Sequence, residues 1–283
     1  MQRSRLERSQ PSTVTVSVPT VVVTLVAIIA GLLLADLGGQ IATYHYGHPG
    51  VLGLVSLFDL DSETNIPSWY SSSALLMCGV VLALIAAVRR RQEDRFLTHW
   101  TVLAVGFVYL SADETAGIHE VIGPMFAGIG RWLTRHASQH FAFLGAFPVY
   151  TWVLPACITV LLVGLWYVRF LLALPRRFGI LFFLSAAIFL GGSIGMEVVG
   201  ARHVLYYGQH DPMYGAMVAL EETMEMSGIA LFLVSLLAYA RSEIGPIQVS
   251  VGVHAAEPAS QAVNERKDLD RLYEPAGVAD RRL

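Results

Sequence analysis

Charged residues are scarce in this chain. They make up 14% of its 283 residues, whereas hydrophobic residues make up 54% and the mean hydropathy is +0.55. Soluble domains usually carry about 25% charged residues, so this composition excludes an ordinary soluble domain and favours a membrane protein. The net charge is only −3. Because no basic patch with interleaved aromatic residues occurs either, nucleic acid is excluded as a partner.

Cysteines and recognisable catalytic motifs are also scarce. Cys78 and Cys157 are the only two cysteines, and each lies within an apolar run. We therefore expect inert packing thiols, without a disulfide or a zinc site. The chain contains no nucleophile elbow, P-loop, H-E-x-x-H pair or dinucleotide fingerprint, so no standard soluble-enzyme chemistry is indicated.

Long apolar runs, by contrast, are abundant. Six of them occur, at about 18–37, 68–88, 97–120, 147–174, 178–199 and 216–240. Because about 20 apolar residues cross a hydrocarbon core, we predict an all-α polytopic membrane protein with six transmembrane helices. The first run has no clear A-x-A cleavage site after it, which favours an uncleaved spanning helix over a secretory signal.

The segments between and beyond these runs are polar. We predict outer loops at 38–67, 121–146 and 200–215, the second of them with a short helix on the membrane surface. Residues 1–17 form a basic segment. Residues 241–283 lack a sustained apolar period, so we predict a disordered tail with one short helix near 261–273.

Arginines set the expected orientation. They cluster in three places: before the first run, at Arg89–Arg91 after the second, and at Arg176 and Arg177 after the fourth. The positive-inside rule puts all three clusters in the cytoplasm, so we predict that both termini are cytoplasmic.

Acidic residues gather at the opposite, outer ends of the helices. Two stretches carry most of them, SADETAGIHE at 111–120 and LEETMEMSG at 220–228. Ionisable groups at the edge of a hydrocarbon-length segment are costly and are by default a functional hypothesis. We found no comparable cluster in the cytoplasmic halves, so we predict a single site. Its candidate residues are Asp113, Glu114, His119, Glu120, Glu197, Glu221, Glu222 and Glu225.

Helical geometry sharpens this prediction. At 100° per residue, Asp113, Gly117 and Glu120 fall within about 60° of one another on one helix face. On the last helix, Glu221, Glu225 and the glycine at 228 form a matching stripe along one face. A glycine in each acidic stripe allows two helix backbones to approach closely. His119 falls on the far side of an ideal helix from Asp113, and it joins the site only if the helix unwinds near Gly117.

The predicted cofactor is a divalent metal ion. Facing carboxylates repel unless a cation, shared protons or an arginine intervenes. Carboxylate oxygens favour calcium, magnesium or manganese, and an added imidazole moves the choice towards manganese, iron or zinc. If the protein is a metal-dependent enzyme, Glu225 and Glu114 are the candidates for moving protons to and from a water molecule that the metal activates. The alternative is that all these acids are simply interfacial and solvated.

A second, minor site is suggested by the outer loop DLDSETN at 59–65. Its alternating acids resemble the start of an EF-hand loop, but Thr64 stands where glycine is needed and Tyr70 where the bidentate glutamate belongs. Irregular calcium binding and a solvated turn that caps the next helix stay open as alternatives. The candidate ligands are Asp59, Asp61, Glu63 and Asn65.

The segments FDLDSETNIPSWYSS, SADETAGIHE, GMEVVG and LEETMEMSG together resemble a group of bacterial multipass membrane proteins of uncharacterised activity. The resemblance covers about Leu57–Tyr239 and implies a topology and a place in the bacterial inner membrane. The chain is more distantly similar to the alkaline ceramidase superfamily of intramembrane metal-dependent hydrolases. It departs from that family because its late helices lack an H-x-x-x-H motif and the family's serine and histidine positions have no counterpart.

Three functional hypotheses follow. The first is a cation-binding membrane protein that supports metal-dependent chemistry on a lipid or small apolar substrate. The second is a proton- or cation-coupled transporter, in which the same acids bind the coupling ion. The third is a non-catalytic membrane or partner protein with structural acids. The inner halves of the helices are mostly Leu, Val, Ala and Phe, which speaks against a polar path through the protein.

Overall fold

A computed structural model describes residues 17–126, 128, 131–132, 135 and 152–245, which belong to one compact unit. These residues are helical, with no strand among them, which confirms the all-α prediction. The elements are α1 (Val18–Tyr44), η1 (Val51–Gly53), α2 (Leu54–Phe58), α3 (Ile66–Arg91), α4 (Leu97–Ala116), α5 (Ile118–Ile122), η2 (Gly123–Phe126), α7 (Val153–Ala173), α8 (Arg176–Leu190), the π-helical η4 (Gly191–Met196), α9 (Glu197–Tyr207), α10 (Pro212–Tyr239) and the π-helical η5 (Ala240–Ile244).

Five stretches of helix within the described part are long and apolar enough to cross a membrane: α1, α3, α7, α8 continued through α9, and α10 continued through η5. These coincide with five of the six predicted spans. The sixth, α4, is 20 residues long but does not reach the same mean hydropathy, because it carries His99, Asp113 and Glu114. That α4 also spans therefore stays a prediction.

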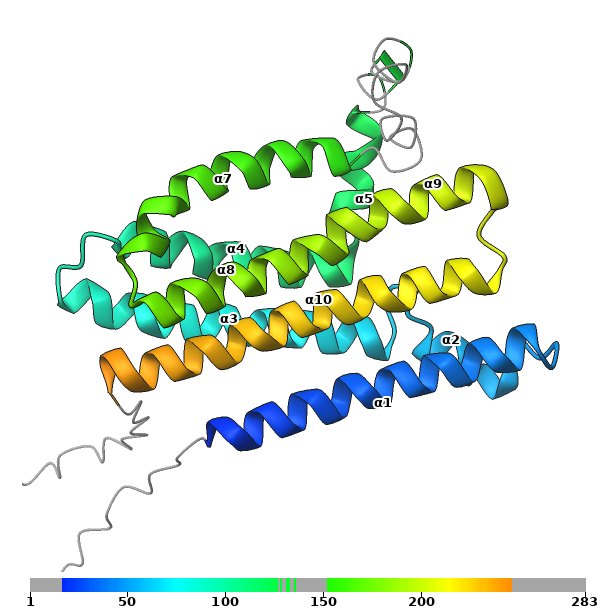
Figure 1. The fold of residues 1–283 in the computed structure, drawn as a ribbon, viewed down its shortest axis with the longest axis horizontal. Helices are drawn as coiled ribbons and strands as arrows, with labels where there is room; N and C mark the ends of the chain where they lie inside the picture. Colours follow the sequence, from blue (N-terminus) through cyan, green and yellow to red (C-terminus); the bar gives the residue numbers. More distant parts are fainter. Residues whose placement is uncertain (1–16, 127, 129–130, 133–134, 136–151, 246–283) are drawn as a thin grey trace, which may run out of the picture. The chain divides into compact units, whose positions relative to one another are not determined.

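Helix α10 occupies the centre of the bundle. It contacts α1, α3, α8 and α9, and Figure 1 shows it running beside α8 on one side and α1 on the other. Helices α3 and α4 pack along each other as a pair, and α7 contacts α8. The main core lies between α3, α4, α7, α8 and α10, where Trp100, Phe170, Phe182 and Leu236 are buried.

The arginines at the end of α3 and at the start of α8 lie together at one end of this bundle. Arg89 at the end of α3 donates to the Tyr239 hydroxyl at 2.6 Å, and Arg177 at the start of α8 pairs with Glu243 in η5 at 3.7 Å. Two arginine clusters that are 88 residues apart in sequence thus meet at the C-terminal end of α10. This clustering is the pattern on which the predicted orientation rests.

The predicted loop boundaries were too wide. Helix α1 continues through Gly38 and Gly39 to Tyr44. An interior glycine lowers helix propensity by about 1 kcal/mol without ending a helix, and here Gln40 donates to Asp36 one turn earlier at 2.7 Å. Helix α9 likewise continues to Tyr207, which reduces the loop predicted at 200–215 to residues 208–211.

Other predicted segments lie mostly outside the described residues. This applies to the basic segment 1–17, to most of the loop 121–146 and to the tail from 246 onward. Where the structure does describe them, α5 and η2 occupy 118–126 and η5 extends the last helix through Ile244.

Glycines set the distance between α8 and α10. A Cβ atom added at Gly228 would lie 2.7 Å from the backbone N of Phe189, and one added at Gly192 would lie 2.8 Å from the carbonyl oxygen of Glu221. These contacts are with backbone or near-backbone atoms, so the helices would have to separate to accept a side chain. The predicted role of the glycine in the α10 stripe is therefore confirmed. It places the acids of α10 directly against η4 and α9.

Candidate functional site

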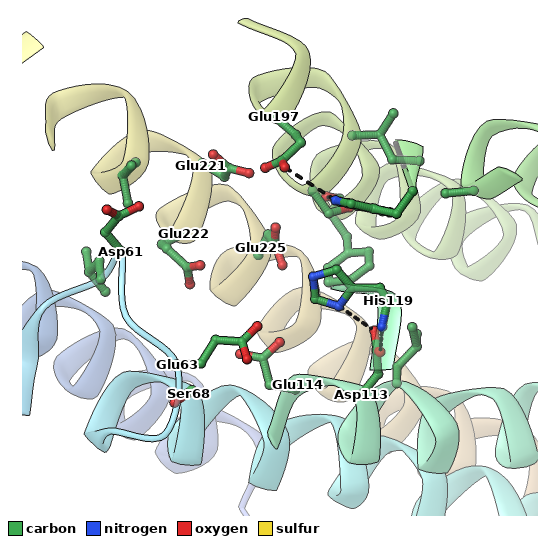
Figure 2. Close-up of a pocket in the computed structure, with 18 of the residues that line it drawn as sticks. Asp61, Glu63, Ser68, Asp113, Glu114, His119, Glu197, Glu221, Glu222 and Glu225 are labelled. Carbon is green, nitrogen blue, oxygen red and sulfur yellow. Dashed lines mark hydrogen bonds and ion pairs between the residues drawn. The ribbon is translucent and has the colours of Figure 1, made fainter. Parts of the chain in front are cut away.

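One cavity of about 570 Å³ lies at the end of the bundle opposite the arginines. It is lined by α3, α4, α7, α10, the stretch α8–η4–α9 and the loop before α3 (Figure 2). Eight carboxylic acids and one histidine border it, and among the described residues no lysine or arginine does. The nine residues are Asp61, Glu63, Asp113, Glu114, His119, Glu197, Glu221, Glu222 and Glu225.

Helix α10 supplies three of the acids. These are Glu221, Glu222 and Glu225, which occupy about one helical turn and line the cavity. Figure 2 shows all three between α9 on one side and Glu63 and Glu114 on the other. No hydrogen bond from a described residue reaches the side chain of Glu222 or Glu225, and both residues are half-buried in the cavity wall. These two carboxyl groups therefore depend on the contents of the cavity for their polar partners.

Glu197 and Glu221 face each other across the junction of α9 and α10. Their carboxyl groups are in hydrogen-bonding contact, and Glu197 Oε1 also accepts a hydrogen bond from Trp152 Nε1 at 3.4 Å. Two carboxylates in contact repel unless a proton or a cation lies between them. The close packing of η4 against α10 forces this contact, because Gly192 rests on the backbone of Glu221.

His119 joins the site because α4 ends at Gly117. This glycine has φ 56° and ψ 39°, the left-handed conformation, and its N–H caps the helix by donating to the Asp113 carbonyl at 2.8 Å. The chain then turns back. The His119 backbone N–H donates to Asp113 Oδ1 at 2.8 Å, and His119 Nδ1 lies 3.2 Å from Asp113 Oδ2. The predicted interruption near Gly117 is thus present, and it pairs two residues that an ideal helix would separate.

The same histidine links α4 to the opposite wall. Its ring contacts Trp152 edge-on, with the ring centroids 5.0 Å apart, and Trp152 in turn donates to Glu197. A continuous line of polar and aromatic contacts therefore runs from Asp113 through His119 and Trp152 to Glu197. Three segments far apart in the sequence, α4–α5, the start of α7 and α9, are thereby connected at this side of the cavity.

The loop before α3 divides between two roles. Asp59 and Asn65 are structural: Asp59 accepts hydrogen bonds from the backbone N–H of residue 61 at 3.1 Å, and Asn65 forms a capping box with Ser68 at the start of α3. The capping alternative for this loop is therefore confirmed for Asn65. Asp61 and Glu63 instead line the cavity.

Asp61 is held at the cavity rim by α10. It accepts a hydrogen bond from the Tyr214 hydroxyl at 2.9 Å. Part of its surface faces the open space, but desolvation by the surrounding protein raises the pKa of Asp61 above its ordinary value, against the lowering effect of the Tyr214 hydrogen bond. The loop acid thus belongs to the main site.

The predicted metal ligands are brought together without forming a metal centre. Among the described residues, no group of three or more histidine, cysteine, aspartate or glutamate side chains is arranged to hold one ion. The acids line several walls of the cavity, and the predicted metal ion stays a prediction. Glu120 lies in α5, and its side chain lies outside the described residues.

Sequence reasoning missed three contributors. Trp152 and Tyr214 each bind an acid of the site, at 3.4 and 2.9 Å. Asp36 is buried in α1, where its two oxygens accept hydrogen bonds from Gln40 and from the backbone N–H of Leu60. It anchors the loop that carries Asp61. A lone aspartate inside an apolar run was the signal that could have identified it.

Residues 20–240 match the family described as a domain of unknown function, DUF8692, and because the match covers most of the chain, the protein belongs to that family. No curated protein and no solved structure matches the chain. The resemblance to ceramidases therefore stays a prediction.

Proposed function

We propose that this protein is a membrane-spanning protein that binds a cation in its carboxylate-lined cavity. The observation that carries the proposal is that eight acids and no described lysine or arginine line one cavity. Ionised carboxylates removed from water cost several kcal/mol each unless an opposite charge compensates them. So many half-buried acids around one cavity favour protons or a bound cation as the compensating charge, and a cation that enters exchanges with protons.

The spread of the acids bears on the kind of cation. A metal ion needs several ligands at about 2.0–2.6 Å from one point, and the described acids do not form such a group. Their arrangement around the wall favours a cation that contacts several walls at once. For this reason no catalytic step is assigned to Glu225 or Glu114, and metal-dependent hydrolysis is not the function proposed here.

The packing near the arginine end determines from which side an ion can reach the cavity. Trp100, Phe170, Phe182 and Leu236 are buried there in a continuous core between five helices. Within the described part of the chain, such a core opposes the passage of an ion from the cavity to the arginine end. The arrangement favours binding from the acidic end, which the positive-inside rule assigns to the outer face of the bacterial inner membrane, with both termini in the cytoplasm.

Transport is the second candidate, and one feature favours it. The spanning stretch α8–η4–α9 is interrupted by a π-helical turn at Gly191–Met196, directly before Glu197. Such turns mark functional sites, and interrupted helices carry the binding sites of many transporters. A bending motion at η4 would open the core and move Glu197 away from Glu221.

Cation binding can be tested by thermal unfolding of the protein in lipid nanodiscs. We would titrate calcium, manganese and a series of alkylammonium ions at fixed pH and ionic strength. A ligand at 100 times its Kd stabilises the native state by about 2.7 kcal/mol, which raises the Tm by roughly 5–11 °C for a chain of this size. We expect at least one cation to produce a saturable rise.

The matched variants are Glu222→Gln/Glu225→Gln, in the cavity, and Glu243→Gln, which lies at the arginine end beside Arg177. The double variant should lose the cation-dependent rise, and Glu243→Gln should keep it. A wild-type Tm that does not respond to any cation of the panel would contradict the proposal. So would a response that is the same in the double variant.

A further inference from the structure

The cavity has an acidic half and an apolar half. Seven apolar residues line its side towards the arginine end: Leu75, Leu110, Ala156, Val160, Phe189, Leu190 and Ile194. Leu60 and Val218 also line the cavity, on its acidic side. On α3, α4, α7 and α8 most of these residues lie one to two helical turns closer to the arginine end than the polar residues of the same wall. A polar mouth therefore leads to an apolar floor.

Glu225 stands where the two halves meet. It is the last acid of α10 to reach the cavity, and the next turn, at Gly228, already packs on the backbone of Phe189, a residue of the apolar floor. Glu225 is half-buried, and its carboxyl group accepts no hydrogen bond from the described residues and points into the cavity (Figure 2). A carboxylate that borders apolar side chains and has no such partner is well placed to bind the charged end of a ligand.

We infer that the ligand is an amphiphilic amine, whose ammonium head contacts Glu222 and Glu225 and whose apolar body lies against Leu75, Leu110 and Val160. The inference rests on the proposed function, because it specifies the cation. Apolar side chains cannot form hydrogen bonds with the water molecules around a metal ion, and they cannot pair with the second charge of a compact diamine. An alkyl chain gains about 0.8 kcal/mol for each methylene that it buries there.

The volume fits this ligand class. Ligand cavities of about 300–1,000 Å³ hold small organic molecules and bury most of their surface, and they combine apolar walls with a few polar groups that fix the orientation. The cavity of about 570 Å³ lies in the middle of that range. Trp152, which lines the cavity and donates to Glu197, adds an aromatic ring beside the acids.

The test is isothermal titration of the nanodisc-embedded protein with ethyl-, butyl-, hexyl- and octylammonium, with empty nanodiscs as the background. The Kd should fall about two- to fourfold for each methylene that reaches the floor, given the transfer free energy of a methylene. Octanol, which lacks the charge, should bind at least tenfold more weakly than octylammonium.

Two pairs of variants separate head from chain. Glu225→Gln should weaken all four amines by a similar factor of at least ten, and Glu243→Gln should leave them unchanged. Val160→Thr should weaken octylammonium by at least threefold and ethylammonium not at all, because it places a hydroxyl in the floor at nearly constant volume. Val163→Thr, on the same helix but 42% exposed and outside the cavity lining, is its control.

The outcomes distinguish this inference from the proposed function. If the four amines bind with equal affinity and Glu225→Gln weakens them, the cation site stands and the amphiphilic ligand is overturned. If octylammonium binds Glu225→Gln as well as wild type, it only partitions into the bilayer and the inference fails. If calcium, manganese and all amines fail to bind, the proposed function fails as well. A two-chain ammonium lipid in the nanodisc that competes with octylammonium would support the inference and identify a lipid as the source of the amine.

Discussion

Gly228 is the position where the fold is most sensitive to a single added atom. In Gly228→Ala the new Cβ would lie 2.7 Å from the backbone N of Phe189, 2.8 Å from its Cβ and 2.9 Å from its Cα. Real Cβ atoms do not approach other heavy atoms this closely, and the atoms that it meets belong to the backbone of α8 or are fixed to it. Neither a rotamer change nor a small local shift relieves the overlap, so α8 and α10 must move apart.

The size of the effect follows from two opposing terms. Alanine is favoured over glycine in a helix interior by about 1 kcal/mol. Overpacking a well-packed contact costs about 1–3 kcal/mol, and a backbone overlap lies at the upper end of that range. The net loss is therefore about 1–2 kcal/mol, which lowers the Tm by roughly 2–8 °C for a chain of this size. Separation of the helices also moves Glu225 away from its wall, so cation affinity should fall with stability.

Thermal unfolding in nanodiscs measures this loss, and Gly164→Ala is the matched control. Gly164 lies in the interior of α7, and a Cβ added there would meet no atom within 4 Å. That variant should keep or raise the wild-type Tm, because only the propensity term applies. If Gly228→Ala unfolds at or above the temperature of Gly164→Ala, the close approach of α8 and α10 is wrong.

Two further predictions concern other anchors of the acidic end. Asp36→Asn replaces an acceptor of two hydrogen bonds by a group with only one acceptor oxygen, so it should cost about 1–3 kcal/mol; an unchanged Tm would contradict the burial of Asp36. Asp211 accepts a hydrogen bond from His203 at 2.8 Å, and this contact lowers the pKa of Asp211 below its ordinary 3.8. The pairing therefore stabilises the fold at pH values above 3.8 and is lost as the pH falls through the lowered pKa. Asp211→Asn should lower the Tm at pH 7 and have a smaller effect near pH 3; a difference that is independent of pH would contradict this assignment.

The sequence was sufficient to predict the helices and the end of the bundle that carries the acids. Apolar runs of about 20 residues with arginines at alternate ends leave little freedom in how the chain crosses a membrane. Once the crossings are known, the acids at 113–114, 197 and 221–225 must lie at the same end. The cavity follows this pattern, since all of these acids line it.

What the sequence could not provide was contact between residues that are far apart in the chain. The Tyr214 hydroxyl reaches Asp61 across 153 positions, and Trp152 reaches Glu197 across 45. Helical periodicity says which face a residue occupies but not which neighbour it meets. The extent of α1 and α9 was missed for a related reason: glycines and polar residues at helix ends look like loop residues until their packing is known.

The metal prediction depended on a step that periodicity does not supply. Stripes of acids on two helices suggested that their carboxylates converge on one ion, but convergence depends on the distance and rotation between helices, which a stripe does not contain. In the structure, glycines bring η4 against α10 and press Glu197 onto Glu221, while Glu222 and Glu225 face the open cavity. The same packing that crowds one acidic pair leaves the others spread around a cavity with an apolar floor. In the ligand that we infer, one ammonium group meets the acids and the alkyl chain meets the floor, and for this reason the length of the alkyl chain is the decisive variable in the binding experiment.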